Sequence, residues 1–179
     1  MPVLHAPTLT DGVVVVRGLR EADVPAIVAA CQDPEIPRWT RVPSPYTVED
    51  ARRFLALAAT EAAAGEGLAL AVTAAGADRL IGTVGLFALH GAQGELGYWT
   101  AAPARGRGLT HRAVTLVRDW AHAELGLATL EIRAHRDNRP SQLVAERAGF
   151  ADTGAIRTAP QMPPGRREGF KVFAWHAPR

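Results

Sequence analysis

The chain has 179 residues, of which 47% are hydrophobic and 21% charged, a composition typical of a globular protein that buries a core without disulfide bonds. Its formal net charge of only +2 at pH 7 argues against a dedicated nucleic-acid binder, in which basic residues gather on one face. The sequence has no signal-peptide pattern and no uncharged apolar run near the ~20 residues of a membrane helix, so we expect a cytoplasmic protein.

The chain begins with a β-branched stretch, residues 13–19, that predicts a strand. A helical pattern over residues 20–33 follows, with Asp23 as its expected N-cap. The single cysteine, Cys31, falls on the apolar side of this helix and is expected to be a buried small hydrophobic residue rather than a nucleophile. Residues 34–47 contain four prolines and predict a loop.

A second helix is predicted to begin after Thr47, because Asp50 stands three residues on and completes a capping box with aspartate in place of glutamate. Gly65 or Gly67 would end it. Three strands follow, with short loops between them that suit antiparallel hairpins: residues 68–74, 79–89 and 94–100.

The rest of the chain continues the alternation of helices and strands. The expected elements are a helix closed by Gly126, a strand, a short helix, a loop and a last strand; the final four cover residues 128–134, 138–150, 160–169 and 170–177. The order β-α-α-β-β-β-α-β-α-β-β predicts one α+β domain over residues 1–179.

The stretch PARGRGLTHRAV, residues 103–114, places two glycines and two arginines at the start of a helical pattern. The N-terminus of a helix has unpaired backbone N–H groups and the positive end of the helix dipole, so it binds anions. Gly106 and Gly108 let a phosphate approach the backbone, and Arg105 and Arg107 add charged donors. We therefore interpret residues 105–110, called here the glycine–arginine loop, as a candidate phosphate cradle.

Other interpretations of this loop fit its residues less well. A P-loop requires a lysine that is absent, and a dinucleotide fingerprint requires a third glycine where His111 stands. An RNA-binding segment of the RGG type would be repeated, whereas this one is single. Taken alone, the loop is also compatible with a solvated turn before a helix.

Further motifs follow in order between residues 95 and 150: the E-L-G-Y-W strand of Glu95 to Trp99, the arginine–glycine element of Arg105, Gly108 and Thr110, the Asn-x-x-Ser pair Asn138 and Ser141, and the pair Gly149 and Phe150. With these motifs the chain resembles the GNAT superfamily of acyl-CoA-dependent N-acyltransferases. Within it, the sequence is similar to the RimJ/RimL branch, which contains N-acetyltransferases of ribosomal-protein N-termini. Residues 20–24, 33–39 and 45–55 also resemble the first half of that branch.

The resemblance implies the GNAT fold, a mixed and mostly antiparallel sheet flanked by helices, with acetyl-CoA as co-substrate. No metal is expected, because no Cys/His cluster has zinc-ligand spacing. The resemblance implies cofactor-binding roles for Trp99, Thr100, Arg105, Gly106, Arg107, Gly108, Leu109, Thr110 and Asn138. The chain departs from the family at Thr110, where a small residue is usual, and at Ala145, where many members have a tyrosine taken as the general acid.

The implied reaction is the attack of a neutral primary amine on the thioester. Glu95 is the expected general base, acting through water, because it shares a strand face with Gly97 and Trp99 and a partly apolar floor favours proton uptake; the alternative is a surface glutamate. Ser141 is the expected acid or donor to the leaving thiolate, with a helix cap as the equal alternative. Backbone N–H groups near Trp99 and Thr100 would meet the thioester oxygen, and Asn138 would hold the pantetheine arm or act as a turn residue.

The acceptor amine is not identified by the sequence. Trp39 and Tyr46 line its site or cover the core, and a peptide would bind in a groove shaped by residues 34–47 and 155–170. The acceptor can be a protein N-terminal α-amine or a small-molecule amine, and the acyl group can be longer than acetyl. His111 and His90 are alternative candidates for the general base. The alternatives from other classes are a non-catalytic acyl-CoA-binding module and an RNA-binding protein. The assembly is open between a monomer and a homodimer.

Overall fold

The computed structural model describes residues 2–159, 162, 165 and 167–178. Its centre is an eight-stranded sheet with the order β1-β2-β3-β4-β5-β6-β8-β7. The strands are β1 (Leu9–Thr10), β2 (Val14–Gly18), β3 (Leu68–Ala74), β4 (Leu80–His90), β5 (Gln93–Thr100), β6 (Thr129–His135), β7 (Ala151–Arg157) and β8 (Phe170–His176). The helices are α1 (Val24–Cys31), α2 (Glu35–Trp39), α3 (Val48–Ala64), α4 (Leu109–Leu125) and α5 (Arg139–Arg147).

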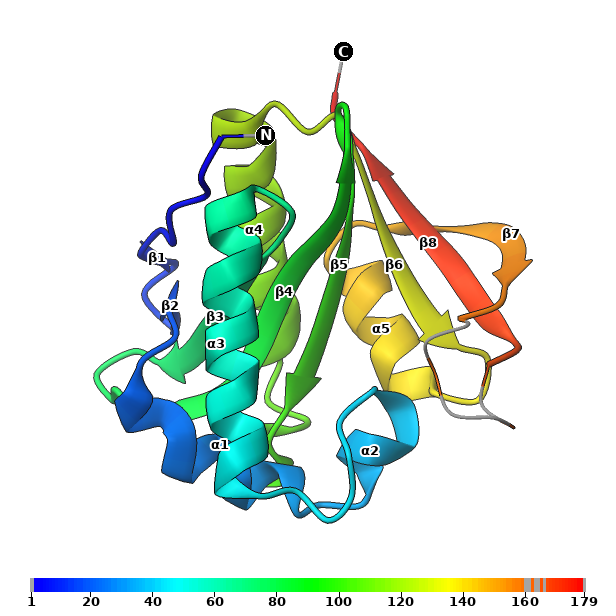
Figure 1. Cartoon of the computed structure of the whole chain (residues 1–179). Helices are drawn as coiled ribbons and strands as arrows, with labels where there is room; N and C mark the ends of the chain where they lie inside the picture. The colour runs from blue at the N-terminus through cyan, green and yellow to red at the C-terminus, as the bar shows by residue number, and fades with distance from the viewer. Residues whose placement is uncertain (1, 160–161, 163–164, 166, 179) are drawn as a thin grey trace.

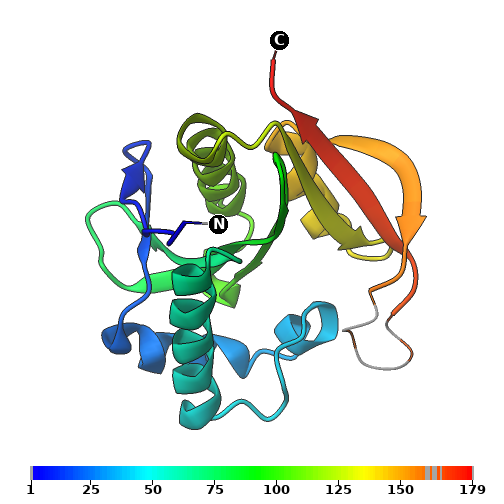
Figure 2. The ribbon, with the colours of Figure 1, turned by 45° about the horizontal axis from the view of Figure 1, so that its top comes forward.

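The predicted mixed and mostly antiparallel sheet flanked by helices is confirmed. The two hairpins β3–β4 and β4–β5 are antiparallel, and β5 and β6 form the parallel pair. Figure 2 shows α4 on one side of the sheet and α1 and α3 on the other. The larger buried cluster joins the sheet to α4 and α5, and a second cluster joins it to α1, α2 and α3. Each face of the sheet is therefore covered by helices.

Local signals in the sequence explain most element ends. Thr47 and Asp50 form the predicted capping box at the start of α3, and Gly65 ends that helix with a φ of 71°. Gly126 ends α4 with a φ of 68°. Left-handed backbone of this kind favours glycine because a side chain would crowd the following carbonyl.

The loop prediction for residues 34–47 is wrong over α2 (Glu35–Trp39). Pro34 is the N-cap residue, and the side chain of Asp33 accepts a hydrogen bond of 3.1 Å from the Glu35 N–H. Pro37 lies in the first turn, where proline removes no helical hydrogen bond because first-turn N–H groups have no acceptor inside the helix. Prolines at these two positions therefore start a short helix instead of preventing it. Of the predicted loop 160–169, residues 160, 161, 163, 164 and 166 lie outside the described residues.

Asp23 occupies the predicted N-cap of α1, but its carboxylate does not cap that helix. It accepts two hydrogen bonds of 2.9 Å from the buried guanidinium of Arg17 and one of 2.9 Å from the Arg20 N–H. Arg17 also donates to the Asp78 carboxylate at 2.8 Å. This network joins β2, the start of α1 and the β3–β4 turn, and it holds α1 against the sheet.

The parallel pair β5–β6 is the feature of the sheet that positions the site. The two strands pair only from Gln93↔Thr129 to Glu95↔Glu131, although β5 continues to Thr100 and β6 to His135. Figure 1 shows the strands separating beyond this point. The resulting gap in the sheet, bounded by residues 96–100 of β5 and 132–135 of β6, is called here the β5–β6 opening.

Candidate active site

The two faces of β5 present different groups beside the β5–β6 opening. Leu96 and Tyr98 belong to or pack against the cluster that includes α4 and α5, whereas Trp99 packs against the cluster on the α1 and α3 side. Because side chains alternate along a strand, Glu95 and Gly97 share the face of Trp99, as predicted. The ring of Phe87 on β4 lies within 3.0 Å of the position that a Cβ on Gly97 would take, and it supplies the apolar floor.

The backbone of β5 directs alternate groups towards β4 and towards the opening. The Ala101 N–H donates to the Ile81 carbonyl at 2.9 Å, which assigns Ala101 and therefore Trp99 to the β4 side. The N–H and C=O groups of Tyr98 and Thr100 consequently face the opening, where β5 has no strand partner. The expected oxyanion donor near Trp99 is thus better supplied by Tyr98 or Thr100.

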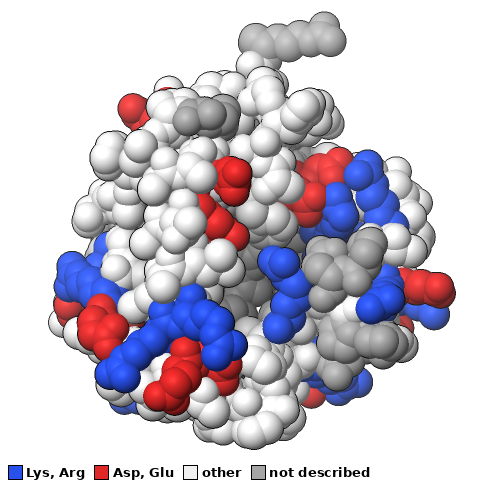
Figure 3. Space-filling view, viewed as in Figure 1, with Lys and Arg blue, Asp and Glu red and all other residues white. Residues whose placement is uncertain are grey.

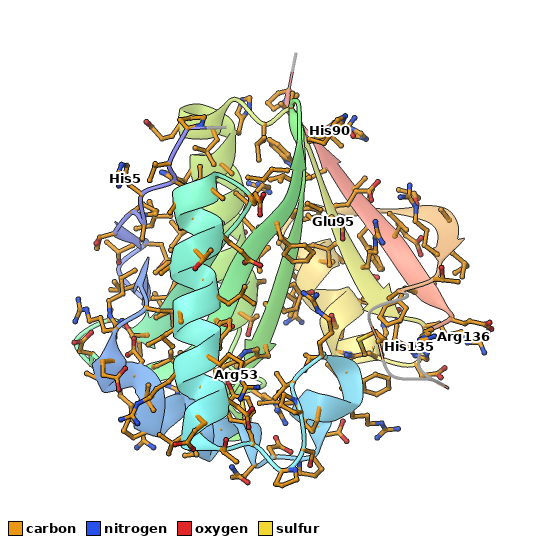
Figure 4. The ribbon with its side chains drawn as sticks, in the orientation of Figure 1. His5, Arg53, His90, Glu95, His135 and Arg136 are labelled. Atoms are coloured by element: carbon orange, nitrogen blue, oxygen red, sulfur yellow. The ribbon has the colours of Figure 1, made fainter. Side chains whose placement is uncertain are left out.

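Glu95 lies near the point where β5 and β6 begin to separate, as Figure 4 shows. Its Oε1 accepts a hydrogen bond of 2.5 Å from Arg133 Nη2 on β6, and the side chains are 15% and 23% exposed. Burial raises the pKa of Glu95 above its usual value, and the positive charge of Arg133 opposes that rise. A half-buried carboxylate with a raised pKa is suited to accept a proton from a nearby amine or water.

The same face of β6 carries a row of polar side chains, because Glu131, Arg133 and His135 alternate with buried residues. Arg157 of β7 lies 3.6 Å from Glu131. Arg133 Nε is buried with no hydrogen-bond partner among the described residues, so this guanidinium retains donor capacity. Figure 3 shows basic side chains beside a hollow in this face of the molecule.

Trp39 and Tyr46 have different positions. The ring of Trp39 lies 5.4 Å from that of His135, which lies 5.4 Å from that of Phe170, so the three rings connect α2, β6 and β8 at one end of the polar row. Tyr46 is 7% exposed and packs among residues of α1, α2 and α3, and burial raises its pKa to about 12. Trp39 therefore fits the predicted acceptor wall, whereas Tyr46 covers the core.

The glycine–arginine loop connects the end of β5 to the start of α4. Helix α4 lies on the other side of the sheet from α1 and α3. Gly106 and Gly108 have φ angles of 72° and 71°, and Gly108 is the N-cap. The N–H groups of Gly106, Arg107 and Gly108 have no hydrogen-bond partner within the described residues. Three free amides at the positive end of a 17-residue helix can bind an anion.

The other residues of this loop have distinct contacts. The Arg105 guanidinium donates to the Thr100 carbonyl at 3.0 Å and lies 2.6 Å from the Asp33 carboxylate, so it braces the loop against β5 and the end of α1. Thr110 Oγ1 lies 2.6 Å from Thr100 Oγ1 and is engaged there. The Leu109 side chain is buried in the core, so only its backbone can contact a ligand. Arg107 is exposed and has no side-chain hydrogen bond or ion pair among the described residues.

On the far side of the opening, the start of α5 holds Ser141. The N-cap of this helix is Asn138, whose side chain accepts a hydrogen bond of 3.2 Å from the Ser141 N–H. The alternative interpretation of Ser141 as the cap is therefore wrong. The side-chain oxygen Oδ1 of Asn138 is engaged in capping. The Tyr98 hydroxyl donates to the Ser141 carbonyl at 2.8 Å. Ala145 is fully buried one turn further along the helix.

His90 and His111, the two alternative candidates for the general base, are less suited to that role than Glu95. His90 is exposed at the tip of the β4–β5 hairpin (Figure 4). His111 lies in the first turn of α4, and burial lowers its pKa. Among the described residues, no group of three or more His, Cys, Asp and Glu side chains could hold a metal ion. None of the described helices combines the length and apolar character that crossing a bilayer requires.

Sequence reasoning missed Arg133, Tyr98 and His135. Arg133 alternates with buried residues in the predicted strand 128–134, so its face could have been inferred, but its partner Glu95 depends on the parallel register of β5 and β6. Tyr98 and Ser141 are 43 residues apart, and no local pattern indicates their contact.

The chain is similar to known proteins both in sequence and in fold. The family described as Acetyltransferase (GNAT) domain matches residues 14–151. The probable N-acetyltransferase YjcK of Bacillus subtilis is 36% identical over 115 residues, which cover 63% of this chain and 64% of the relative. The chain thus spans less than two thirds of the length of that relative.

Solved structures share the whole fold. RimJ of Mycobacterium smegmatis, determined in complex with CoA-disulfide, matches with a TM-score of 0.81 and 20% identity over 96% of this chain and 87% of that chain. The α-N-protein acetyltransferase RimL matches with a TM-score of 0.83 and 15% identity over 96% of this chain and 95% of that chain. At these identities the likeness is one of fold.

The ion pair between Arg133 and Glu95 should influence the pKa of the Glu95 carboxyl group. Because Arg133 stabilises the carboxylate, the substitution Arg133→Met is expected to raise the pKa of Glu95 further. The measurement is a pH titration of the Glu95 carboxyl carbon by NMR. The control Arg133→Lys retains the charge and should leave the pKa closer to that of the unsubstituted protein. An unchanged pKa in Arg133→Met would contradict the assignment.

Proposed function

Because the chain belongs to the GNAT acetyltransferase family, we propose that it transfers the acetyl group of acetyl-CoA to a primary amine. The observation that carries the proposal is the β5–β6 opening, which has free backbone amides of the glycine–arginine loop on one side and the half-buried Glu95 on the other. We extend the proposal to the full 179-residue chain as one catalytic domain. A cytoplasmic location and a homodimer stay predictions.

The residues present fit an acyl-CoA. The amides of Gly106, Arg107 and Gly108 are free to hold a diphosphate, and the exposed Arg107 can add a charged contact. The Tyr98 carbonyl and the Thr100 N–H, on the unpaired edge of β5, can bind an extended amide chain such as pantetheine, as an added strand binds a sheet edge. The structure of RimJ with CoA-disulfide supports a CoA ligand for this fold.

Two sides of the opening supply the two halves of the chemistry. Glu95 removes a proton from the amine, directly or through water, so that the neutral amine attacks the thioester carbonyl. The Tyr98 N–H, fixed in β5, stabilises the negative charge that develops on the carbonyl oxygen. As the carbon–sulfur bond breaks, the Ser141 hydroxyl donates a hydrogen bond to the leaving sulfur. The amine is thus activated on the α1–α3 side, and the thiol leaves on the α5 side.

The acceptor that the site favours is the α-amine of a peptide. Arg133 has spare donors beside Glu95, and a peptide N-terminus carries a carbonyl oxygen close to its amine that could accept from them. Trp39, His135 and Phe170 provide an aromatic wall at the end of the polar row. A small-molecule amine and a longer acyl group stay open as alternatives within the same reaction class.

Two further candidates come from other classes. A non-catalytic acyl-CoA-binding module would share the loop and the opening but would not turn over. An RNA-binding role is disfavoured because Arg105, one of its two expected contacts, is engaged with Thr100 and Asp33.

Acetyl-CoA binding at the loop can be tested with matched glycine substitutions at the two ends of α4. Gly106 and Gly126 have φ angles of 72° and 68°, and a Cβ on either would meet nothing within 4 Å. Both alanine variants therefore carry similar backbone strain. Gly106→Ala is expected to weaken acetyl-CoA binding by about tenfold or more, which corresponds to about 1.4 kcal/mol, whereas Gly126→Ala should bind normally. Isothermal calorimetry measures both, and equal affinities would place the diphosphate elsewhere.

The role of Glu95 can be tested by turnover. Glu95→Gln removes the base and is expected to lower kcat by ~10²-fold or more. Release of the CoA thiol from acetyl-CoA, with a panel of peptides and small amines as acceptors, measures this. Glu124→Gln is the control and should turn over normally, because Glu124 is an exposed residue of α4, on the other side of the sheet from α1 and α3. Undiminished turnover in Glu95→Gln across the pH range would remove Glu95 from the mechanism.

A further inference from the structure

A pair of hydroxyl groups spans the space behind the β5–β6 opening. The Tyr98 hydroxyl, carried by β5, donates to the Ser141 carbonyl at 2.8 Å, and Ser141 Oγ, carried by α5, donates to the Tyr98 hydroxyl oxygen at 3.2 Å. The ring of Tyr98 packs against the buried cluster that includes α4 and α5. The tyrosine therefore connects the free stretch of β5 to the first turn of α5.

Ser141 is held independently of its hydroxyl. Its N–H donates to the Asn138 side chain and its carbonyl accepts from Tyr98, so both backbone groups have partners. The hydroxyl does not cap the helix, because Asn138 does so. The hydroxyl hydrogen is therefore free to turn towards another acceptor without loss of the helix start.

The Tyr98 and Ser141 hydroxyl groups have enough hydrogen-bond donors for the Ser141 hydroxyl to turn towards a ligand. The pair has two O–H hydrogens. If the Ser141 hydroxyl turns to a ligand, the Tyr98 hydroxyl still donates to the Ser141 carbonyl and keeps the serine in place. Burial raises the pKa of Tyr98 well above its ordinary value, so the phenol keeps its proton in the working pH range.

We propose that Tyr98 is a positioning residue for the leaving thiol: it holds Ser141 so that the serine hydroxyl donates a hydrogen bond to the sulfur of CoA. This inference rests on the proposed function. Glu95 has taken one proton from the ammonium group before the attack. When the carbon–sulfur bond breaks, the sulfur keeps the electron pair, and the second proton that the nitrogen loses goes to solvent water. The Ser141 hydroxyl hydrogen-bonds the thiolate, and Tyr98 neither gains nor loses a proton.

The test follows the thiol of CoA itself, which needs no acceptor amine. The thiolate absorbs in the ultraviolet, so a pH titration of CoA bound to the protein reports the pKa of its thiol. A donor to the thiolate lowers that pKa, and we expect a decrease of about 1 unit relative to free CoA. Tyr98→Phe, which keeps the ring and removes only the hydroxyl, should return the pKa towards the value of free CoA. Ser141→Ala should do the same, and the double variant should add nothing further.

Thr153→Val is the matched control, because it deletes a hydroxyl that donates to the Val172 carbonyl at 2.9 Å on the distant strand β7. It should leave the thiol pKa unchanged. Calorimetry with CoA and thermal unfolding are measured for every variant, so that a loss of folding is seen separately.

The outcomes distinguish this inference from the proposed function. If CoA binds to all variants and the thiol pKa is the same in Tyr98→Phe as in the unsubstituted protein, the role of Tyr98 is overturned while CoA binding stands. If Tyr98→Phe lowers only the unfolding temperature, Tyr98 has a structural role and the inference is likewise overturned. If the unsubstituted protein gives no heat with CoA, the proposed function fails. A coupled loss of the pKa shift in both single variants supports the inference.

Discussion

The limited pairing of β5 with β6 is the constraint on which the rest of the site depends. Their register ends at Glu95↔Glu131, and each strand then continues without the other. A strand edge with unpaired N–H and C=O groups is costly when it is buried and reactive towards any extended partner when it is open. The backbone of Tyr98 and the Thr100 N–H are therefore available to a ligand, whereas the Thr100 carbonyl already accepts from Arg105.

The opening is braced by contacts that cross it or secure its ends. At the end of β5, the pair Thr100–Thr110 and the bond from Arg105 to the Thr100 carbonyl hold the glycine–arginine loop in place. Tyr98 and Ser141 connect β5 to α5 behind the gap. Glu95 and Arg133 connect the two strands near the point where they part, in an environment that raises the pKa of the carboxylate. These contacts fix the separation of the groups that the proposed reaction requires.

The sequence predicts the local features of this fold well. Capping residues such as Thr47, the glycines that end α3 and α4, and the alternation along β5 depend on neighbours in the chain, so their placement follows from local physics. The short helix α2 was missed because prolines usually indicate a loop, and here they stand in the first turn. Contacts set by tertiary structure could not be predicted: Arg133 meets Glu95 only through the β5–β6 register, Tyr98 meets Ser141 only through the placement of α5, and Arg105 contacts Asp33 rather than standing free. The motif resemblance identified the loop and the strand, but it could not say which side chains were already engaged.

The central claim is that the free edge of β5 receives the acyl-pantetheine. Amide hydrogen exchange, resolved by residue with NMR, tests it most directly in the presence and absence of acetyl-CoA. Acetyl-CoA bound along this edge should slow exchange at the Tyr98 and Thr100 amides, which face the opening, and change little at the Trp99 amide, which faces β4. Unchanged exchange at Tyr98 and Thr100 under saturating acetyl-CoA would show that the ligand does not bind along β5.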